Sequence, residues 1–336
     1  MKFSYLTSIG FALILLSFFL LDSDKQSDSF MTIKGEVMGT TYKVILKGAE
    51  LQTYDKQINN IFEQVNQEMS TYLDTSSISQ INNKDLFEWT KVSENFKFVL
   101  SFALTLCKDT NGIYDVSVGR LVNTWGFGPY EANNPSTEDN QKMLNDIGCD
   151  SVEINQDSVR RMKDVHLDFS SIAKGYAIDL VHNKLISDKE IESHYIELGG
   201  EIRTSSIKES NTPWTVGIED PEKPSNSIFK LQSNKFKEFA VATSGDYRNV
   251  RIFDKQLLSH TIDVDSGKPK KFSKSSVTVV ANSAMTADAL ATALNAMEQK
   301  EALRYANLND INTIFLSHEN NKTNLILSNS MLKIVK

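Results

Sequence analysis

The sequence predicts an α+β fold with antiparallel strands, for two reasons. Helical and strand-like segments are mixed along the chain without the strict alternation that is typical of a parallel α/β sheet. Strand-like segments also follow one another directly, as in HYIELGGEIRTS and in the closing pair NTIFLS and TNLILSN. With 336 residues, 40% of them hydrophobic, and no internal repeat after residue 30, we expect one domain of mixed and antiparallel sheets with packed helices over residues 31–336.

Apolar residues at helical spacing predict most of the helices. One amphipathic helix ends at Ser70, and it carries Ile58, Ile61, Phe62, Val65 and Met69. A second helix runs from about residue 95 to the stop signal at residues 111–112. Ser136 and Asp139 resemble a capping box that begins a short helix. Two further helices are expected in the segments IAKGYAIDLVHNKLI and ADALATAL.

The strands are expected to be short. GEVMGTTYKVIL is predicted to be one strand that is interrupted at Gly39, with Met38 where the backbone can approach a ligand closely. DVSVGRLVNTWGFGP is predicted to begin as a strand and to continue as a glycine- and aromatic-rich loop. Further strands are expected between residues 151 and 169 and in the segments WTVGIED, IFKLQ, EFAVAT, VRIF and SHTIDV.

The first 30 residues have the layout of an export signal. Lys2 precedes an apolar run from Tyr5 to Leu21, and a polar segment follows. We expect a signal peptide or an uncleaved signal anchor over residues 1–30, and the remainder of the chain in the periplasm. A buried N-terminal helix is the alternative. The run contains no cysteine, so a lipoprotein anchor is not expected.

Charge and cysteine content narrow the class of protein. The net charge is −7, so the chain lacks the excess of Lys and Arg that phosphate contacts require, and nucleic acid is not an expected partner. Of the two cysteines, Cys107 lies on an apolar helical stripe and is expected to be a core thiol. A disulfide between Cys107 and Cys149 is the alternative, and the sequence does not decide between them.

A late alanine-rich helix carries a candidate metal site. Asp288 and Thr292 are four residues apart and therefore lie on one helix face, and Asn295 extends this polar stripe. A carboxylate and a hydroxyl are oxygen ligands of the kind that Mg²⁺ takes. Taken alone, the pair is more typical of an ordinary solvent-facing helix surface.

A second candidate site lies at the start of an earlier helix. In LDFSSIAKGYAID, Ser170 and Ser171 stand at the helix entrance, where free N–H groups favour an anion, and Lys174 adds a positive charge. Asp168 precedes the helix and can accept a hydrogen bond from a base or a ribose. Alternatively, Ser170 is only a helix cap and Lys174 only a solvated side chain.

His260 is the candidate general base. It lies in SHTID, between a strand and a glycine-containing loop, with Asp263 nearby. A histidine with a pKa near neutral can take a proton from a hydroxyl nucleophile. A structural role is the alternative. The nearby turn TSGDYR contains Arg248, which either binds phosphate or pairs with Asp246.

Eight motifs, in order and with consistent spacing, make the chain similar to the ApbE family of FAD:protein FMN transferases. They span about residues 33–335: GEVMGTTY, MSTYLDTSSIS, YDVSVGRLVNTWGFGP, LDFSSIAKGYAID, IELGGEIR, ATSGDYRN, SHTIDVDSGKP and ADALATAL. The resemblance implies an Mg²⁺-dependent enzyme with FAD as substrate. FAD is cleaved, FMN is joined by a phosphoester to Thr or Ser of an acceptor protein, and AMP leaves.

The resemblance also implies roles for particular residues. Flavin and FAD contacts fall to Met38, Tyr72, Ile113, Tyr114, Asp115, Asp168, Lys174 and Ile262. The metal ligands are Asp288, Thr292 and the backbone carbonyl of Ser171, and His260 is the base. Expected acceptors are subunits of a Na⁺-translocating NADH:quinone reductase or an Rnf-type complex. The chain departs from the family at Ser170 and Ser171, often Gly-Ala, at residues 264–266, usually Pro-Arg-Thr, and at Arg120, often proline.

Two other functions use the same residues. One is an Mg²⁺-dependent FAD pyrophosphatase that releases FMN and AMP to water. The other is a non-catalytic protein that binds and delivers FAD. Product analysis separates the first from a transferase, and FAD that stays intact in the presence of Mg²⁺ identifies the second.

Overall fold

The computed structural model describes residues 30–48, 54–133, 135–247, 249–319 and 322–335. Within these ranges the largest element is an eight-stranded sheet in which every neighbouring pair is antiparallel, as the sequence predicted. In spatial order its strands are β1 (Met31–Val37), β2 (Thr40–Gly48), β6 (Ile191–Leu198), β7 (Glu201–Thr204), β12 (Phe239–Gly245), β16 (Ser275–Ala281), β17 (Asn312–Glu319) and β18 (Lys322–Leu327).

Alternating side chains give this sheet two buried faces. In β12, Phe239 and Val241 pack into one apolar cluster, whereas Ala242 packs into another. β17 repeats the pattern, with Ile314 and Leu316 on the first side and Phe315 on the second. Successive residues of a strand point to opposite faces, so the chain has a layer of structure on each side of the sheet.

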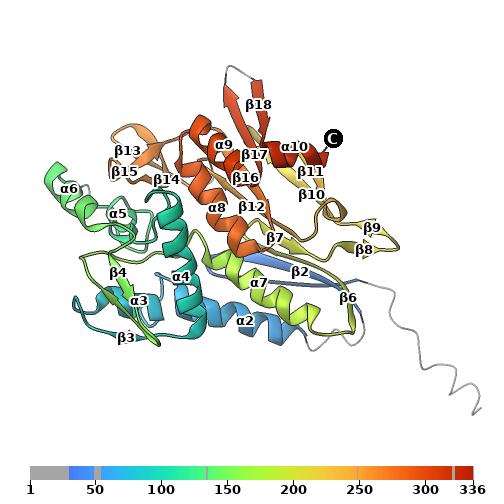
Figure 1. The fold of residues 1–336 in the computed structure, drawn as a ribbon, viewed down its shortest axis with the longest axis horizontal. Coiled ribbons are helices and arrows are strands. Elements are labelled where there is room, and N and C mark those ends of the chain that lie inside the picture. Colours follow the sequence, from blue (N-terminus) through green and yellow to red (C-terminus); the bar gives the residue numbers. More distant parts are fainter. Residues whose placement is uncertain (1–29, 49–53, 134, 248, 320–321, 336) are drawn as a thin grey trace, which may run out of the picture.

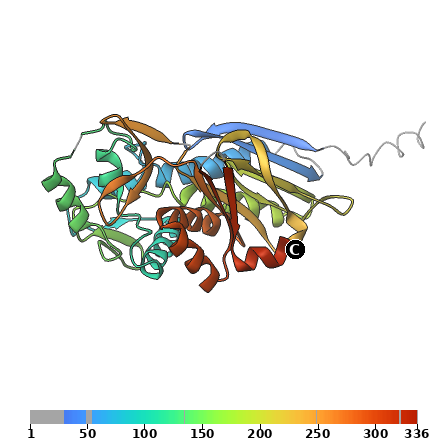
Figure 2. The same ribbon diagram turned by 90° about the horizontal axis from the view of Figure 1, so that it is seen from above.

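Helices cover one face of the sheet, and a strand ribbon covers the other. α7 (Ala173–Ile186) contacts β6 and β7, and α8 (Ala284–Ala296) contacts β12 and β16. α2 (Tyr54–Met69) packs against α7, and α9 (Gln299–Leu308) packs beside α8. The opposite face is covered by β10 (Thr215–Asp220), β11 (Lys223–Gln232) and α10 (Asn329–Val335). Figures 1 and 2 show α7 and α8 near the middle of the molecule.

The remaining elements form the part of the molecule to the left in Figure 1. α4 (Glu94–Asp109) joins the main core through Phe96, whose ring packs on Phe169. Around it lie α3 (Ser77–Asn83), α5 (Gly119–Thr124), α6 (Thr137–Asp146), β3 (Thr90–Lys91), β4 (Val152–Ile154), β5 (Ser158–Arg161), β13 (Val250–Phe253), β14 (Gln256–Asp263) and β15 (Lys268–Lys271). The short elements β8 (Ile207–Glu209), β9 (Thr212–Pro213) and η2 (Ser233–Lys235) lie near the β10–β11 ribbon.

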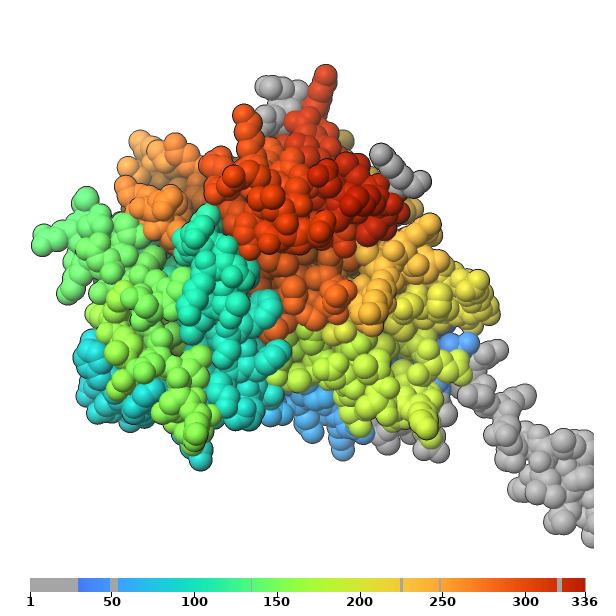
Figure 3. All heavy atoms as spheres, viewed as in Figure 1, coloured from blue at the N-terminus to red at the C-terminus, as the bar shows by residue number. Residues whose placement is uncertain are grey.

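Segments from the two ends of the described chain pack together in one domain. In the space-filling view the C-terminal third, orange to red, covers the upper part of the visible face. Segments from the first half, blue to green, cover the lower part and the left (Figure 3). The structure supports the predicted single domain of mixed helices and antiparallel sheets.

Most predicted helices are confirmed, because their signals are local. α2 buries Ile58, Phe62 and Val65. The side chain of Ser136 accepts a hydrogen bond from Asp139 N at 3.0 Å and begins α6. α4 ends two residues before the predicted stop signal, and α7 begins one residue after the start of IAKGYAIDLVHNKLI, whereas α8 begins three residues before ADALATAL.

Two predictions along the chain are wrong. GEVMGTTYKVIL is a hairpin of β1 and β2, because Met38 and Gly39 both have positive φ, 52° and 71°, which is typical of a tight two-residue turn. The segment GRLVNT is the helix α5, whereas a strand followed by a loop was expected. Its start at Gly119 lies against the backbone of His166, where only a glycine fits.

The export prediction concerns residues 1–30, of which 1–29 lie outside the described part of the chain. Among the described helices, none has the length and apolar character needed to cross a bilayer.

Candidate functional site

The candidate site is a cavity of about 950 Å³ where α7, α8, β14 and the loop after α4 meet. All twelve residues singled out from the sequence line it, although they come from segments up to 254 positions apart. They are Met38, Tyr72, Ile113, Tyr114, Asp115, Asp168, Ser171, Lys174, His260, Ile262, Asp288 and Thr292. The structure brings these side chains together, and their individual roles remain predictions.

Asp288 is a buried carboxylate, not a solvent-facing one. It is 5% exposed, and its Oδ2 accepts a hydrogen bond from the backbone N–H of Gly175 at 3.0 Å. Burial raises the pKa of Asp288, and the nearby Lys174 opposes that rise. Thr292 lies one turn later on α8 and is half-buried. The ordinary-surface interpretation of this pair is therefore wrong for Asp288.

The contact between α7 and α8 also affects the carbonyl of Ser171. In a continuous helix, Gly175 N–H would donate to the carbonyl four residues earlier, that of Ser171. The first bond of α7 runs instead from Tyr176 N to Ile172 O, and Gly175 N–H donates to Asp288. Ser171 thus presents a backbone oxygen beside a buried carboxylate.

Gly175 is required for this close approach. A Cβ built at Gly175 would lie 2.3 Å from Ala284 O and 2.7 Å from Met285 Cα, both in α8. Asp179, one turn along α7, accepts from Ala284 N at 2.8 Å and from Met285 N at 2.9 Å. These contacts cap the N-terminus of α8 and fix it against α7.

The serines before α7 are not a helix cap. α7 begins at Ala173, with Ile172 in the cap position and no side-chain cap bond, so the alternative interpretation of Ser170 as a helix cap is wrong. Ser170 N–H donates to Asp168 Oδ1 at 2.8 Å, which makes a local turn typical of aspartate. Lys174 lies in the first helical turn, and its Nζ is 3.4 Å from Glu201 Oε1. The charged groups Asp168 and Lys174 thus line the cavity from both sides of this turn.

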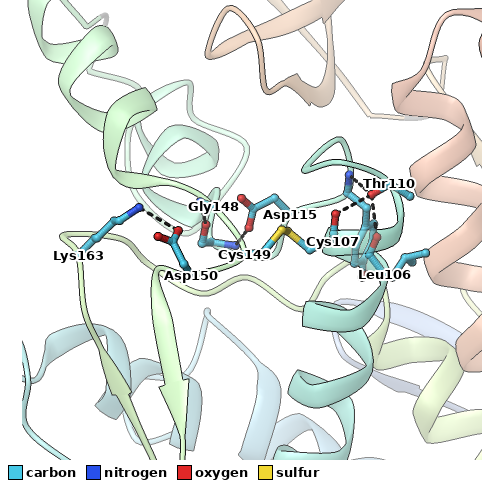
Figure 4. Close-up of a disulfide and its surroundings, with 10 residues drawn as sticks. Leu106, Cys107, Thr110, Asp115, Gly148, Cys149, Asp150 and Lys163 are labelled. Carbon is cyan, nitrogen blue, oxygen red and sulfur yellow. Dashed lines mark hydrogen bonds and ion pairs between the residues drawn. A yellow bond between two sulfur atoms is a disulfide. The ribbon is translucent and has the colours of Figure 1, made fainter.

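The loop after α4 is held by hydrogen bonds and by a disulfide. The hydroxyls of Tyr114 and Ser171 are 3.0 Å apart in a hydrogen bond, and Asp115 Oδ1 accepts from Ser117 N at 2.8 Å. Cys107, at the end of α4, forms a disulfide with Cys149, with Cα atoms 5.7 Å apart (Figure 4). Cys107 is fully buried, as expected, but the expected free thiol is wrong.

His260 projects from β14 into the cavity and is half-buried. Burial lowers its pKa, while the negative charge of Asp246 opposes that effect. The imidazole is therefore neutral at neutral pH and able to accept a proton. Its Nδ1 is buried and has no hydrogen-bond partner among the described residues. Among the described residues, Asp263 makes no hydrogen bond to His260. Its carboxylate accepts hydrogen bonds from Asp265 N and Ser266 Oγ, and these bonds shape the following turn.

Apolar and aromatic groups complete the cavity. Ile262 is buried, whereas Tyr72 is 66% exposed and lies at the surface. The Tyr72 hydroxyl donates to Phe127 O at 3.2 Å, across 55 residues of sequence. Met38, in the β1–β2 turn, also lines the cavity. A flat aromatic ligand would find apolar surface here, while charged groups lie around α7 and α8.

Sequence reasoning missed two acidic groups at this site. Glu201 lines the cavity and is 6% exposed, with Oε2 lacking a partner among the described residues. Burial raises the pKa of Glu201 to about 7. Asp179 on α7 forms an ion pair with Arg203 on β7, with 2.6 Å between Oδ1 and Nη1. The spacing of Asp179 four residues after Gly175 could have indicated its place on the same helix face. Glu201 lies in the motif IELGGEIR, but no role was assigned to it. Arg248 lies outside the described residues.

Comparison with known proteins decides the family. The model of the ApbE family matches residues 38–315. The chain belongs to the ApbE family. An FAD:protein FMN transferase of Vibrio cholerae is 34% identical over 309 residues, covering 90% of this chain and 92% of the relative. Another, of Haemophilus influenzae, is 33% identical and covers 84% of each chain.

Solved ApbE structures have the same fold as this ApbE-family chain. The Vibrio cholerae flavin transferase ApbE superposes with a TM-score of 0.78 at 31% identity, covering 91% of this chain and 99% of that one. The apo flavinyl transferase ApbE of Pseudomonas stutzeri gives a TM-score of 0.83 at 28% identity, covering 93% and 98%. The family expected from the eight motifs is confirmed.

Proposed function

We propose that this ApbE-family chain is an FAD:protein FMN transferase that depends on Mg²⁺. Family membership supports the reaction class, and one contact carries the assignment of the site. Because Gly175 N–H donates to Asp288, the Ser171 carbonyl is left without its helical donor, and Ser171, Asp288 and Thr292 line one cavity together with His260.

The donors present fit a hard divalent cation. A carboxylate, a hydroxyl and a backbone carbonyl are oxygen ligands, and Mg²⁺ completes its shell with water and substrate oxygens. Among the described residues no three His, Cys, Asp or Glu side chains group as a metal cluster, so the site would depend on this mixed set. Two buried carboxylates, Asp288 and Glu201, face the cavity near Lys174, and a cation would offset their charge. Bound there, it would neutralise charge on the FAD pyrophosphate.

The protein's own groups would position the substrates. Lys174 and the turn at Ser170 would hold a phosphate, Asp168 a ribose or base, and the apolar wall at Tyr72 the flavin. Such positioning accounts for most of the catalysis of phosphoryl transfer.

His260 would take the proton of the incoming Thr or Ser hydroxyl. The hydroxyl oxygen then forms a bond with the FMN phosphorus, and the bond between that phosphorus and the bridging oxygen breaks. AMP leaves with the bridging oxygen. A lowered pKa keeps His260 neutral and ready to accept this proton at neutral pH.

The cellular setting is also proposed. An exported domain held near the membrane by residues 1–30 would meet acceptor subunits of Na⁺-translocating NADH:quinone reductase or Rnf-type complexes. The disulfide between Cys107 and Cys149 supports an oxidising compartment such as the periplasm.

Mass spectrometry of a candidate acceptor tests the function. The purified protein is incubated with FAD, Mg²⁺ and the acceptor, and we expect one FMN on a Thr or Ser and free AMP in equal amount. Asp288→Asn should abolish both products, whereas Leu308→Ser, at an exposed position of α9, should not. FMN released entirely to water would show a pyrophosphatase, and intact FAD a binding protein.

A further inference from the structure

Asp246 is a buried carboxylate with several hydrogen bonds outside the catalytic cavity. It is 2% exposed and directly follows β12. Its Oδ1 accepts from Ser259 Oγ at 2.8 Å and from Asn295 Nδ2 at 3.0 Å. Its Oδ2 accepts from Ser273 Oγ at 3.0 Å, and Ser275 Oγ lies 3.4 Å away. The two carboxylate oxygens of Asp246 therefore accept hydrogen bonds from two different sets of side chains.

The first oxygen holds the strand of the candidate base. Ser259 and Thr261 flank His260 on β14, and both are buried. The Thr261 hydroxyl lies 3.5 Å from Asp246 Oδ1. Since successive side chains of a strand alternate, Ser259 and Thr261 face Asp246 while His260 faces the cavity. These bonds resist rotation of the strand, which would swing the imidazole away from its substrate.

The same oxygen also holds the helix of the candidate metal site. Asn295 lies in the last turn of α8, two turns after Asp288 and about one turn after Thr292, so all three share a helix face. Asn295 Nδ2 reaches both Asp246 Oδ1 and, at 3.4 Å, Thr261 Oγ1. One buried atom thus joins β14 to α8.

We propose that Asp246 is a positioning residue that fixes His260 relative to Asp288 and Thr292. This role rests on the function proposed above. Asp246 acts through its neighbours, because no hydrogen bond between Asp246 and His260 is found among the described contacts. Hydrogen bonds to a buried charge are strong and directional. They can therefore hold the His260 imidazole at the distance from Asp288 and Thr292 that proton transfer requires.

A pair of serine variants tests the proposal. Ser259→Ala and Ser273→Ala each remove one hydroxyl donor from Asp246, the first on Oδ1 and the second on Oδ2. Both should lower the unfolding midpoint to a similar extent. Only Ser259→Ala should lower kcat, by about tenfold, with the Kd for FAD unchanged. Equal kcat effects from both variants, or a change in FAD affinity alone, would overturn the proposal.

A second measurement does not depend on turnover. The charged groups that act on His260 are Asp246 and Asp168, which raise its pKa, and Lys174, which lowers it, against a background of burial. Ser259→Ala and Ser273→Ala both keep the Asp246 charge, so a change in the His260 pKa reports movement of the imidazole and not loss of that charge. NMR titration should give a His260 pKa that differs from wild type in Ser259→Ala and matches wild type in Ser273→Ala. A wild-type protein that forms no FMN adduct would refute the proposed function, whereas the titration still decides the positioning role: the same His260 pKa in both variants would reject it.

Discussion

Replacing Gly175 with alanine should separate the two helices that form the candidate metal site. The added Cβ would lie 2.3 Å from Ala284 O and 2.6 Å from Ala284 C, and both are backbone atoms that cannot rotate away. Restoring ordinary contact requires α8 to move by about 1 Å. That movement lengthens the 3.0 Å hydrogen bond from Gly175 N to Asp288 Oδ2 beyond a useful distance.

Two effects lower the free energy of unfolding of Gly175→Ala, and one raises it. Overpacking costs about 1–3 kcal/mol, and a weakened hydrogen bond to the buried Asp288 carboxylate about 1.5–3 kcal/mol. Alanine regains about 1 kcal/mol of helix propensity over glycine. The free energy of unfolding of Gly175→Ala should therefore fall by about 2–4 kcal/mol. A 1 Å displacement of Asp288 should reduce FMN transfer by about a hundredfold.

Urea unfolding and the rate of AMP release measure these effects. The matched control is Gly217→Ala in β10, where the Cβ would meet the Ser227 side chain at 2.8 Å, on the sheet face opposite the site. The control should lose stability but keep its rate at temperatures where it is folded. Wild-type activity and Mg²⁺ affinity in Gly175→Ala would refute the reasoning about the interface of α7 and α8.

Two further predictions concern stability. Replacing both Cys107 and Cys149 with alanine opens a loop of 42 residues and should lower the free energy of unfolding by about 4 kcal/mol. In urea, the reduced wild-type protein should unfold at the same midpoint as this variant. A variant with the midpoint of the oxidised wild type would contradict the prediction. Burial lowers the pKa of His182 to about 3 and of His194 to about 4, so both are neutral when folded. The stability that these neutral imidazoles contribute is complete above pH 6.5 and is lost as the pH falls towards 4. At pH 5 the loss is on the order of 2 kcal/mol for each histidine. In urea titrations, His194→Gln should make the free energy of unfolding depend less on pH, and an unaltered slope would refute the prediction.

Local signals in the sequence predicted much of the fold. The stripe of α2 and the cap at Ser136 depend on neighbours within one or two helical turns, and both were found. Where conformation depends on distant contacts, prediction failed. Gly119 begins a helix because it meets the backbone of His166, 47 positions away, and no local pattern reports that contact.

The candidate site shows the same division. The side chains of Asp288 and Thr292 could be placed on one helix face from their spacing alone. The sequence could not show that Gly175 N–H donates to Asp288 across 113 positions, nor that the turn at Ser170 precedes α7 without capping it. Glu201 was given no role, and Asp246 was considered only as a partner of Arg248, for the same reason: their importance comes from burial and from partners on other elements.

The most direct test is a crystal structure of the protein soaked with FAD and Mn²⁺, a cation that Mg²⁺ sites accept, with data collected for anomalous scattering. We expect one strong peak between the Asp288 carboxylate, the Thr292 hydroxyl and the Ser171 carbonyl, beside the FAD pyrophosphate. A fully occupied metal peak or a pyrophosphate bound away from these three groups would contradict the proposed site.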